Sequence, residues 1–594
     1  MECLQYPFDA QLILRTKKKI RRALLETGEP RISKRIAILG GSTTAEIRAV
    51  LELFLLDQGI EPAFYESEYG RYWQDIMFPN PALQEFSPDI ICIHTTARNI
   101  GQFPKITDSP EIIDRKLTGT FDHFRQIWEK IAETYSCPVI QNNFERPWYR
   151  LLGNKDISDP HGHSNFIVRL NTKLYEYSQT HPDLHVNDID FLASSYGLQK
   201  WNDPTYWYLY KYAPAPDAVP ELAFNLANII KSIYGKNKKA LALDLDNTLW
   251  GGVIGEDGAE KIEIGQETPG GQLFSEFQTY IKNQKALGTL LTVVSKNDME
   301  NALAGLNHPD SILKPEDFLV IRANWEPKDR NLKEIADELN IGTDAFVFVD
   351  DNPAERHIVR SQLPGTAVPE LGTPETYLTT LDRSGFFELN SLSEDDLHRS
   401  DMYKANLLRS ETQAAFSDYN DYLRSLEMKA EIKPFSSLYL ARIAQLTNKS
   451  NQFNLTTRRF TEAELAQAAE DPDCITLYGK LTDRFGDNGI VSVVLGHREG
   501  QVFTIDLWLM SCRVLKRDME YAMMDELVRR CRAEGAATLR GLYYPTKKNS
   551  MVRTFYGDQG FRKISEDEAG NSVWEMDISG NYEYKNRLIS VNTD

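Results

Sequence analysis

Two aspartates at the end of an apolar run are the most informative residues of this chain. Asp244 and Asp246 stand two residues apart in LALDLD (241–246). In a strand this spacing places both side chains on one face. Carboxylates held that close repel each other, and a bound divalent cation relieves the repulsion. The pair suits phosphoryl transfer, with one carboxylate as nucleophile and the other moving a proton, although a simple turn at a strand end would also explain it.

Polar residues also close two later apolar runs. Ser295 ends LLTVVS, where its hydroxyl would hold a phosphate oxygen, and Asp350 and Asp351 end AFVFVDD, where they would add carboxylates to a metal site. Lys328 would supply a fixed positive charge, or it is an exposed lysine in the first turn of a helix. Because ligands of parallel α/β sheets bind beyond the carboxyl ends of the strands, these residues are expected to meet.

In this order the four motifs resemble those of the haloacid-dehalogenase (HAD) superfamily of phosphatases. The resemblance implies a nucleophile, a general acid/base, two phosphate-binding groups and a Mg²⁺ site. These are respectively Asp244, Asp246, Ser295 with Lys328, and a metal set of Asp244, Asp246 and Asp351 beside Asp350. The stretches between Asp244 and Ser295 and between Ser295 and Lys328 are too short for a cap domain. An open site is therefore expected, suited to a large partner or to coverage by a neighbouring domain.

Four stretches further along the chain resemble FkbH-type proteins. They are 442–460, 481–492, 509–520 and 543–561, and the last also resembles the end of an acetyltransferase-like (GNAT) fold. The resemblance implies loading of a glyceryl unit from 1,3-bisphosphoglycerate onto the phosphopantetheine thiol of an acyl carrier protein, with loss of both phosphates, for polyketide or other secondary-metabolite biosynthesis. It implies as partners that carrier protein and a phosphorylated three-carbon substrate.

Cys512 is our candidate for the thiol that carries the acyl group, because a thiol converts an acyl phosphate into a thioester. If HREGQ (497–501) is the turn of a hairpin, Cys512 faces Asp487 to within two residues, and His497 lies at the far end. An unpaired cysteine at a strand end is also commonly a small buried apolar residue. Both interpretations stay open.

Several polar side chains are candidates for substrate binding in this block and after Ser295. They are Asn297, Lys449, Asn451, Asn454, Asp487 and Arg513. For the stretch 442–460, a loop rich in side-chain-to-backbone hydrogen bonds is an equally good interpretation. Lys516 and Asp518 stand where a CoA-binding turn requires small residues, which argues against CoA.

The N-terminal block resembles SGNH-type hydrolases at two positions. Ser42 follows a strand and a glycine pair, as the nucleophile does, and Asn99 corresponds to the oxyanion-hole asparagine. The best match to the Asp-x-x-His base pair is Asp203 with Tyr206. Tyrosine does not accept a serine proton at neutral pH. A degenerate hydrolase fold with a structural or docking role is therefore expected.

The elements that must position these residues are short apolar strands alternating with helices, which predict parallel, helix-covered sheets. The fold class expected is multidomain α/β. It consists of an SGNH- or flavodoxin-like domain (1–235), a Rossmann-like HAD domain (236–390) and a GNAT-like α+β domain (391–594).

Composition sets the remaining expectations. The 594 residues are 41% hydrophobic and 26% charged, which is an ordinary globular balance. A net charge of −19 opposes nucleic acid as a partner. No apolar stretch is long enough for a membrane span, the first residues lack the order of a signal peptide, and six scattered cysteines indicate reduced thiols. We expect a cytoplasmic protein with Mg²⁺ as its cofactor.

The favoured function is the glyceryl transfer coupled to phosphatase activity described above. Two alternatives remain: a stand-alone Mg²⁺-dependent HAD phosphatase or phosphotransferase, and a CoA-dependent acyltransferase with a scaffold HAD domain. The string matches in the third block count against the first alternative, and the missing glycines count against the second.

Overall fold

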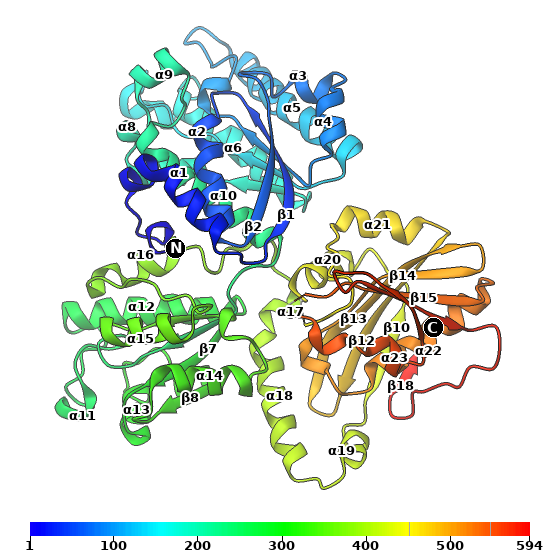
Figure 1. Ribbon diagram of the computed structural model, residues 1–594. Coiled ribbons are helices and arrows are strands. Elements are labelled where there is room, and N and C mark those ends of the chain that lie inside the picture. The colour runs from blue at the N-terminus through cyan, green and yellow to red at the C-terminus, as the bar shows by residue number, and fades with distance from the viewer. Residues whose placement is uncertain (451, 547, 594) are drawn as a thin grey trace. The chain divides into compact units, whose positions relative to one another are not determined.

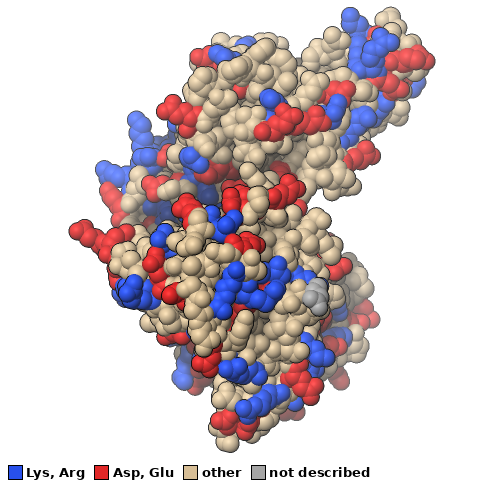
Figure 2. Space-filling model, turned by 90° about the vertical axis from the view of Figure 1, so that its right-hand side faces the viewer, with Lys and Arg blue, Asp and Glu red and all other residues tan. Residues whose placement is uncertain are grey.

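The computed structural model describes residues 1–450, 452–546 and 548–593, without the side chains of Lys449 and Cys512. The chain forms two compact units. One comprises Met1–Lys236 with Glu388–Ser391, and the other Asn237–Phe387 with Leu392–Asp594. Among the described residues no helix is long and apolar enough to cross a membrane. Figure 2 shows one face of the molecule, on which acidic and basic side chains are interspersed.

The first unit is built on a parallel sheet that includes β1 and β2 (Figure 1). The order of its strands is β2-β1-β3-β4-β5. Its strands are β1 (Ile32–Gly40), β2 (Ile60–Glu66), β3 (Ile90–His94), β4 (Val139–Asn142) and β5 (Leu184–Asn187). The central strand β3 is buried along its whole length, because apolar clusters cover both faces of the sheet.

Helices on the two faces of this sheet supply the core. On one face lie α1 (Ala10–Glu26), α2 (Ala45–Asp57) and α10 (Val219–Ile233), and on the other α5 (Pro110–Tyr135) and α6 (His163–Gln179). The shorter helices are α3 (Gln74–Met77), α4 (Pro81–Phe86), α7 (Ile189–Tyr196), α8 (Leu198–Trp201) and α9 (Pro204–Tyr210).

The second unit begins with a four-stranded parallel sheet in the order β8-β7-β6-β9. Its strands are β6 (Ala240–Leu243), β7 (Leu290–Ser295), β8 (Val320–Ala323) and β9 (Phe346–Val349). Helices cover both faces, so β6, β7 and β9 are fully buried. The helices are α11 (Ile254–Asp257), α12 (Pro269–Ala286), α13 (Met299–Leu306), α14 (Lys328–Glu338), α15 (Pro353–Gln362) and α16 (Tyr377–Arg383).

After α17 (Glu394–Leu397), α18 (Arg399–Ala414) and α19 (Tyr419–Ser425), the described residues form a nine-stranded mixed sheet. Its order is β16-β17-β15-β14-β13-β12-β10-β18, with β11 paired to β14. The strands are β10 (Lys429–Lys433), β11 (Phe453–Asn454), β12 (Cys474–Asp483), β13 (Gly486–Glu499), β14 (Val502–Met510), β15 (Thr538–Tyr543), β16 (Arg562–Glu566), β17 (Ser572–Asp577) and β18 (Ser590–Asn592). Its helices are α20 (Leu440–Lys449), α21 (Glu462–Glu470), α22 (Met519–Ala533) and α23 (Phe555–Asp558).

The predicted hairpin between β13 and β14 is present, but its predicted register is wrong. The turn falls at Gly500–Gln501, and a bulge between Leu495 and Gly496 shifts the pairing further, so that Met510 faces Ser492. Asp487 lies beyond this pairing and instead faces Thr482 of β12. One irregular residue in a strand displaces every later pair, which counting from the turn cannot foresee.

Candidate active site

The site lies where β6 and β9 run side by side and end. Asp244 directly follows β6, and Asp350 and Asp351 follow β9. The backbone N–H of Asp244 donates to the carbonyl of Val349 at 3.0 Å, which fixes the two strand ends against each other. The order of the strands reverses at β6, with β7 and β9 on opposite sides of it. A ligand site is expected at such a switch point.

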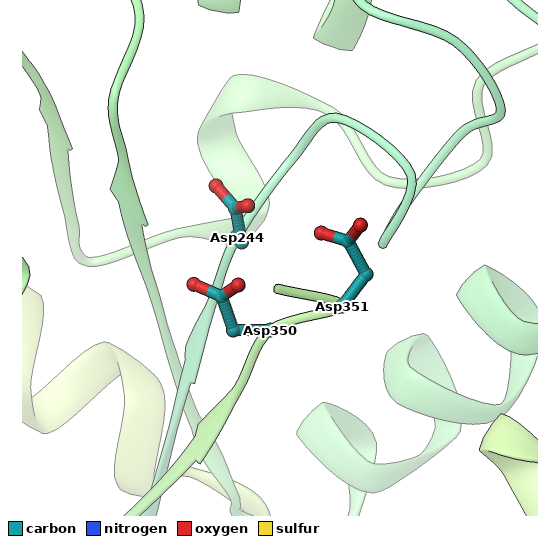
Figure 3. Close-up of side chains that lie close together, drawn as sticks. All are labelled: Asp244, Asp350 and Asp351. Atoms are coloured by element: carbon teal, nitrogen blue, oxygen red, sulfur yellow. The ribbon is translucent and has the colours of Figure 1, made fainter. Parts of the chain in front are cut away.

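Three carboxylates meet at this point, as Figure 3 shows. One oxygen from each of Asp244, Asp350 and Asp351 lies within 4.8 Å of the others. Hard oxygen ligands of this kind suit Mg²⁺ and Ca²⁺. The donor set therefore fits a divalent cation.

Lys328, the first residue of α14, brings a positive charge to the same point. Its Nζ lies 2.9 Å from Asp244 Oδ2 and 2.6 Å from Asp350 Oδ2, and only 3% of its side chain is exposed. Burial by itself would lower the pKa of Lys328, but Asp244 and Asp350 outweigh it and raise that pKa. Burial and the nearby Asp244 raise the pKa of Asp350. The lysine is charged, and a phosphate placed here would meet it.

Asp246 takes a different place from the one expected in the metal set. Its Oδ1 accepts hydrogen bonds from Trp250 Nε1 at 2.9 Å and from the backbone N–H of Ile254 at 3.2 Å. Its Oδ2 accepts from Asn297 Nδ2 at 3.1 Å. Burial raises the pKa of Asp246. Its carboxylate is held beside the triad rather than within it, and Asp350 completes the group of three.

Two further predicted residues lie at the same edge of the sheet. Ser295 is the last residue of β7 and is buried, and its carbonyl accepts the backbone N–H of Asn324 at 3.2 Å. Asn297 is also buried, and it contacts Asp246 directly. Its amide therefore orients a neighbouring side chain as well as lining the strand ends.

Sequence reasoning missed the residue that holds the aspartate pair in place. Arg356, on α15, donates from Nη1 to the carbonyls of Asp350 at 2.8 Å and Asp351 at 2.7 Å, and from Nη2 to Glu370 at 3.2 Å. It is 5% exposed. The sequence does hold a signal for this role, because Arg356 lies one turn into the helix that follows the two aspartates. A long side chain at that position points back toward the end of the preceding strand.

The residues predicted to bind an acyl chain in the C-terminal block do not form one group among those described. Three of the predicted residues lie outside the described part of the structure. They are Asn451 and the side chains of Lys449 and Cys512, of which only the backbone is described. Asp487 is exposed and pairs with Lys480 at 2.8 Å. Arg513 Nε donates to Ser511 Oγ at 3.2 Å.

Asn454 belongs to a segment that fills a gap in the sheet. Phe453 and Asn454 pair with the end of β14, while Tyr544, just after β15, donates its N–H to the carbonyl of Leu455 at 2.9 Å. The side chain of Asn454 bonds Ser450 and Thr457 of its own segment. The segment therefore bridges the end of β14 and the residue that follows β15.

The turn before α22, where a CoA-binding protein would have small residues, has left-handed backbone at two non-glycine residues. Lys516 has φ 64° and Asp518 has φ 62°. This region costs side-chain-bearing residues free energy and is where glycine is normally found. The acidic Asp518 occupies the N-cap of α22. The acidic side chain of Asp518 at this position weighs against a bound pyrophosphate.

Ser42 and Asn99 follow neighbouring strands of the first unit, whereas Asp203 begins a helix. Ser42 is buried, and its Oγ makes no hydrogen bond among the described residues. Asn99 Nδ2 donates to the carbonyl of Gly41 at 2.9 Å. Asp203 caps α9 by accepting the N–H groups of Thr205 and Tyr206, so it orients a helix rather than a base.

Fold and site together define an α/β phosphatase domain of the HAD type. The family model for the N-terminal domain of FkbH matches residues 35–231. The chain is also similar to the solved N-terminal part of the protein BF1531 from Bacteroides fragilis, which contains a phosphatase domain and is complexed with Mg. The identity is 30% and the TM-score 0.58, over 63% of this chain and 99% of that one. The chain belongs to this family of FkbH-like phosphatases.

A second solved structure resembles the C-terminal part only weakly. The ribosomal-protein-S18-alanine N-acetyltransferase from Escherichia coli is 13% identical, with a TM-score of 0.21, over 27% of this chain and 99% of that one. A similarity this low supports no argument about fold or activity. No curated protein matches the chain.

Proposed function

We propose that this enzyme removes phosphate from a phosphorylated three-carbon acyl substrate and loads the acyl unit, a glyceryl group derived from 1,3-bisphosphoglycerate, onto an acyl carrier protein. The observation that carries the phosphatase half is the buried contact of Lys328 with both Asp244 and Asp350. Such a site holds a carboxylate nucleophile beside a fixed cation, as phosphoryl transfer requires.

The chain's own residues divide the dephosphorylation between them. An Asp244 oxygen attacks phosphorus, the ester P–O bond breaks, and Asp246 donates a proton to the departing alkoxide. Water then attacks the aspartyl phosphate, Asp246 takes the proton of the water, and inorganic phosphate leaves. Trp250 and Asn297 hold the Asp246 carboxylate for both proton transfers.

Asp244, Asp350 and Asp351 would hold Mg²⁺. When bound, the ion supplies positive charge to the phosphate oxygens. Its proposed identity draws on the oxygen donor set and on the Mg-complexed Bacteroides structure.

The transfer half is assigned to Cys512. Its thiolate attacks the acyl carbon of the acyl phosphate, a C–S bond forms, the C–O bond to phosphate breaks, and inorganic phosphate leaves. The pantetheine thiol of the carrier then attacks this thioester, takes the acyl group, and returns its proton to the Cys512 sulfur. The FkbH-type sequence strings and the chemistry of acyl phosphates support this assignment.

Intact-protein mass spectrometry tests the proposal. A carrier protein with its phosphopantetheine arm is incubated with enzyme, Mg²⁺ and 1,3-bisphosphoglycerate, and should gain the mass of one glyceryl group. Cys512→Ala should abolish that gain while phosphate release from the ester continues, and Cys474→Ala, which removes another free thiol, serves as the matched control.

The outcomes separate the alternatives. Phosphate release without any carrier loading by wild-type enzyme would favour the stand-alone phosphatase. Normal loading by Cys512→Ala would remove the covalent step and leave direct transfer to pantetheine. Loading of CoA in place of the carrier would favour the acyltransferase alternative.

A further inference from the structure

An exposed indole stands on the rim of the phosphatase site. Trp325 lies between β8 and α14 and is 70% exposed. Single exposed apolar side chains are common on protein surfaces, so exposure alone assigns no role. For Trp325, its position beside the site and its fixed orientation do indicate a role.

The loop that carries Trp325 is anchored to the site at both ends. The preceding residue, Asn324, donates its N–H to the carbonyl of Ser295 at 3.2 Å. Its side chain also exchanges two hydrogen bonds with Asn331 of α14. Three residues after the indole, Lys328 reaches Asp244 at 2.9 Å. Trp325 is therefore held between two phosphate-binding positions.

The orientation of the ring is set by Asp298. The indole Nε1 donates to Asp298 Oδ1 at 3.0 Å, and the N–H of Asp298 donates to Asn297 Oδ1 at 2.9 Å. Asn297 in turn bonds Asp246. The one polar atom of the ring is thereby satisfied within the protein, and the surface left exposed is apolar.

The described residues between Asp244 and Lys328 form no separate domain that would cover that surface. Between β6 and β7 the described residues form only α11 and α12 as regular helices, and between β7 and β8 only α13 and a 3₁₀ turn. Both connections belong to the same compact unit as the site. Loops and short helices therefore form the rim of the site. These short connections agree with the expectation that the site has no cap domain.

We propose that Trp325 is a specificity-determining residue that packs against the apolar part of a pantetheine-like arm when the phosphate ester is presented on a carrier protein. This rests on the proposed function. A free three-carbon phosphate carries mainly hydroxyl, carboxyl and phosphate groups. When such polar groups contact an indole face, little apolar surface is removed from water. An arm with methyl and methylene groups buries that face, and aromatic side chains gain most from such burial.

The test compares two phosphate esters for each variant: 3-phosphoglycerate free in solution, and the phosphoglyceryl thioester of a carrier protein. Trp325→Ala should lower the ratio of kcat/KM for the carrier-bound ester to that for the free ester about tenfold, through a higher KM. Trp325→Phe, which retains an apolar ring, should recover most of the ratio.

Two control variants sharpen the result. Leu438→Ala removes an equally exposed apolar side chain of the same unit, 78% exposed, and should leave the ratio at the wild-type value. Asp298→Ala, which frees the indole to rotate, should lower the ratio less than Trp325→Ala does. An unchanged ratio in Trp325→Ala, or an equal loss with both esters, would overturn the inference and leave the proposed function standing. Failure of wild-type enzyme to hydrolyse the carrier-bound ester would overturn this inference, whereas the proposed function fails only if the carrier protein gains no glyceryl group.

Discussion

The two parallel sheets of this protein share a plan but differ in what stands at their strand ends. In the first unit, the ends of β3, β4 and β5 carry His94, Asn142 and Asn187. Asn142 Nδ2 meets His94 Nδ1 at 2.9 Å, and Asn187 Nδ2 donates to Asn142 Oδ1 at 2.7 Å. In the second unit, the ends of β6 and β9 carry Asp244 and Asp350 with a lysine between them.

The comparison shows that topology selects the place and side chains select the chemistry. Neutral amides that satisfy one another stabilise a buried strand edge and have no charge with which to assist a reaction. Several carboxylates around one lysine repel one another, and the single positive charge does not balance them. A bound cation would supply the missing positive charge. Only the second arrangement is ready for phosphoryl transfer.

The largest effect is expected when the lysine of the charged edge is removed. Lys328→Met leaves Asp244 and Asp350 buried without their cation, so phosphate release should fall about 10²- to 10³-fold. The unfolding free energy should also fall by about 3 kcal/mol, since breaking a buried ion pair leaves a charge uncompensated. Phosphate-release kinetics and urea unfolding measure the two effects.

Lys296→Met is the control for that variant. This lysine follows Ser295 immediately but is partly exposed and pairs with Glu355. Its loss should cost at most about 1 kcal/mol and leave phosphate release within a few-fold of wild type. Equal effects of the two substitutions would show that the buried contacts of Lys328 have no special role.

The next effect concerns metal affinity and distinguishes two neighbouring aspartates. Asp351→Asn removes a member of the triad and should weaken Mg²⁺ binding about 10- to 100-fold, measured by calorimetric titration. Asp246→Asn should slow phosphate release with a much smaller change in Mg²⁺ affinity, because its carboxylate faces Trp250 and Asn297. Equal weakening by both would restore Asp246 to the metal set that the sequence suggested.

A smaller effect, on stability alone, is expected at the amide edge. Asn142→Ala leaves His94 Nδ1, the carbonyl of Thr95 and the amide of Asn187 without their partner. The unfolding free energy should fall by about 3 kcal/mol, and phosphate release by the folded enzyme should not change. Asn154→Ala, at an exposed position, is the control. Loss of phosphate release without loss of stability would give the first unit a role in the reaction.

The smallest effect is a pH dependence in the first unit. Burial raises the pKa of Glu145 from 4.5 to about 7. Because the folded pKa lies above the unfolded one, the stability that the protonated carboxyl contributes is present below about pH 4.5 and is lost as pH rises through 7. The unfolding free energy of wild type should fall by about 2 kcal/mol relative to Glu145→Gln between about pH 5 and 7.

The buried His94, whose pKa burial lowers to about 4, also titrates on unfolding but is present in both proteins and cancels from this difference. Urea unfolding at several pH values measures it. Parallel curves for wild type and Glu145→Gln would show that the carboxyl titrates alike in both states.

The charged site was largely predictable because most of its residues end or follow an apolar strand. Asp244, Ser295 and the aspartate pair could be found in this way, since parallel strands bring their carboxyl ends to one edge. Lys328 begins a helix, and the order of the four motifs identified it. The side-chain direction of Asp246 could not, because it depends on the hydrogen bond from Trp250 in the turn after the strand and on the one from Asn297, which is distant in sequence and brought close only by folding.

The parts of the fold that the sequence did not predict depend on irregular backbone. The register of β13 and β14 is shifted by the bulge at Leu495, which leaves no mark in the pattern of apolar residues. The two-residue strand β11 is defined entirely by its partners on β14 and after β15. Periodicity carries no information about so short a segment.

We assign the phosphoryl chemistry to the charged strand edge and not to the serine of the first unit. Phosphate release measured side by side for Asp244→Asn and Ser42→Ala, with circular dichroism to confirm folding, tests it most directly. No release above background is expected for Asp244→Asn, and a wild-type rate is expected for Ser42→Ala. Full release by folded Asp244→Asn, with loss in Ser42→Ala, would contradict it.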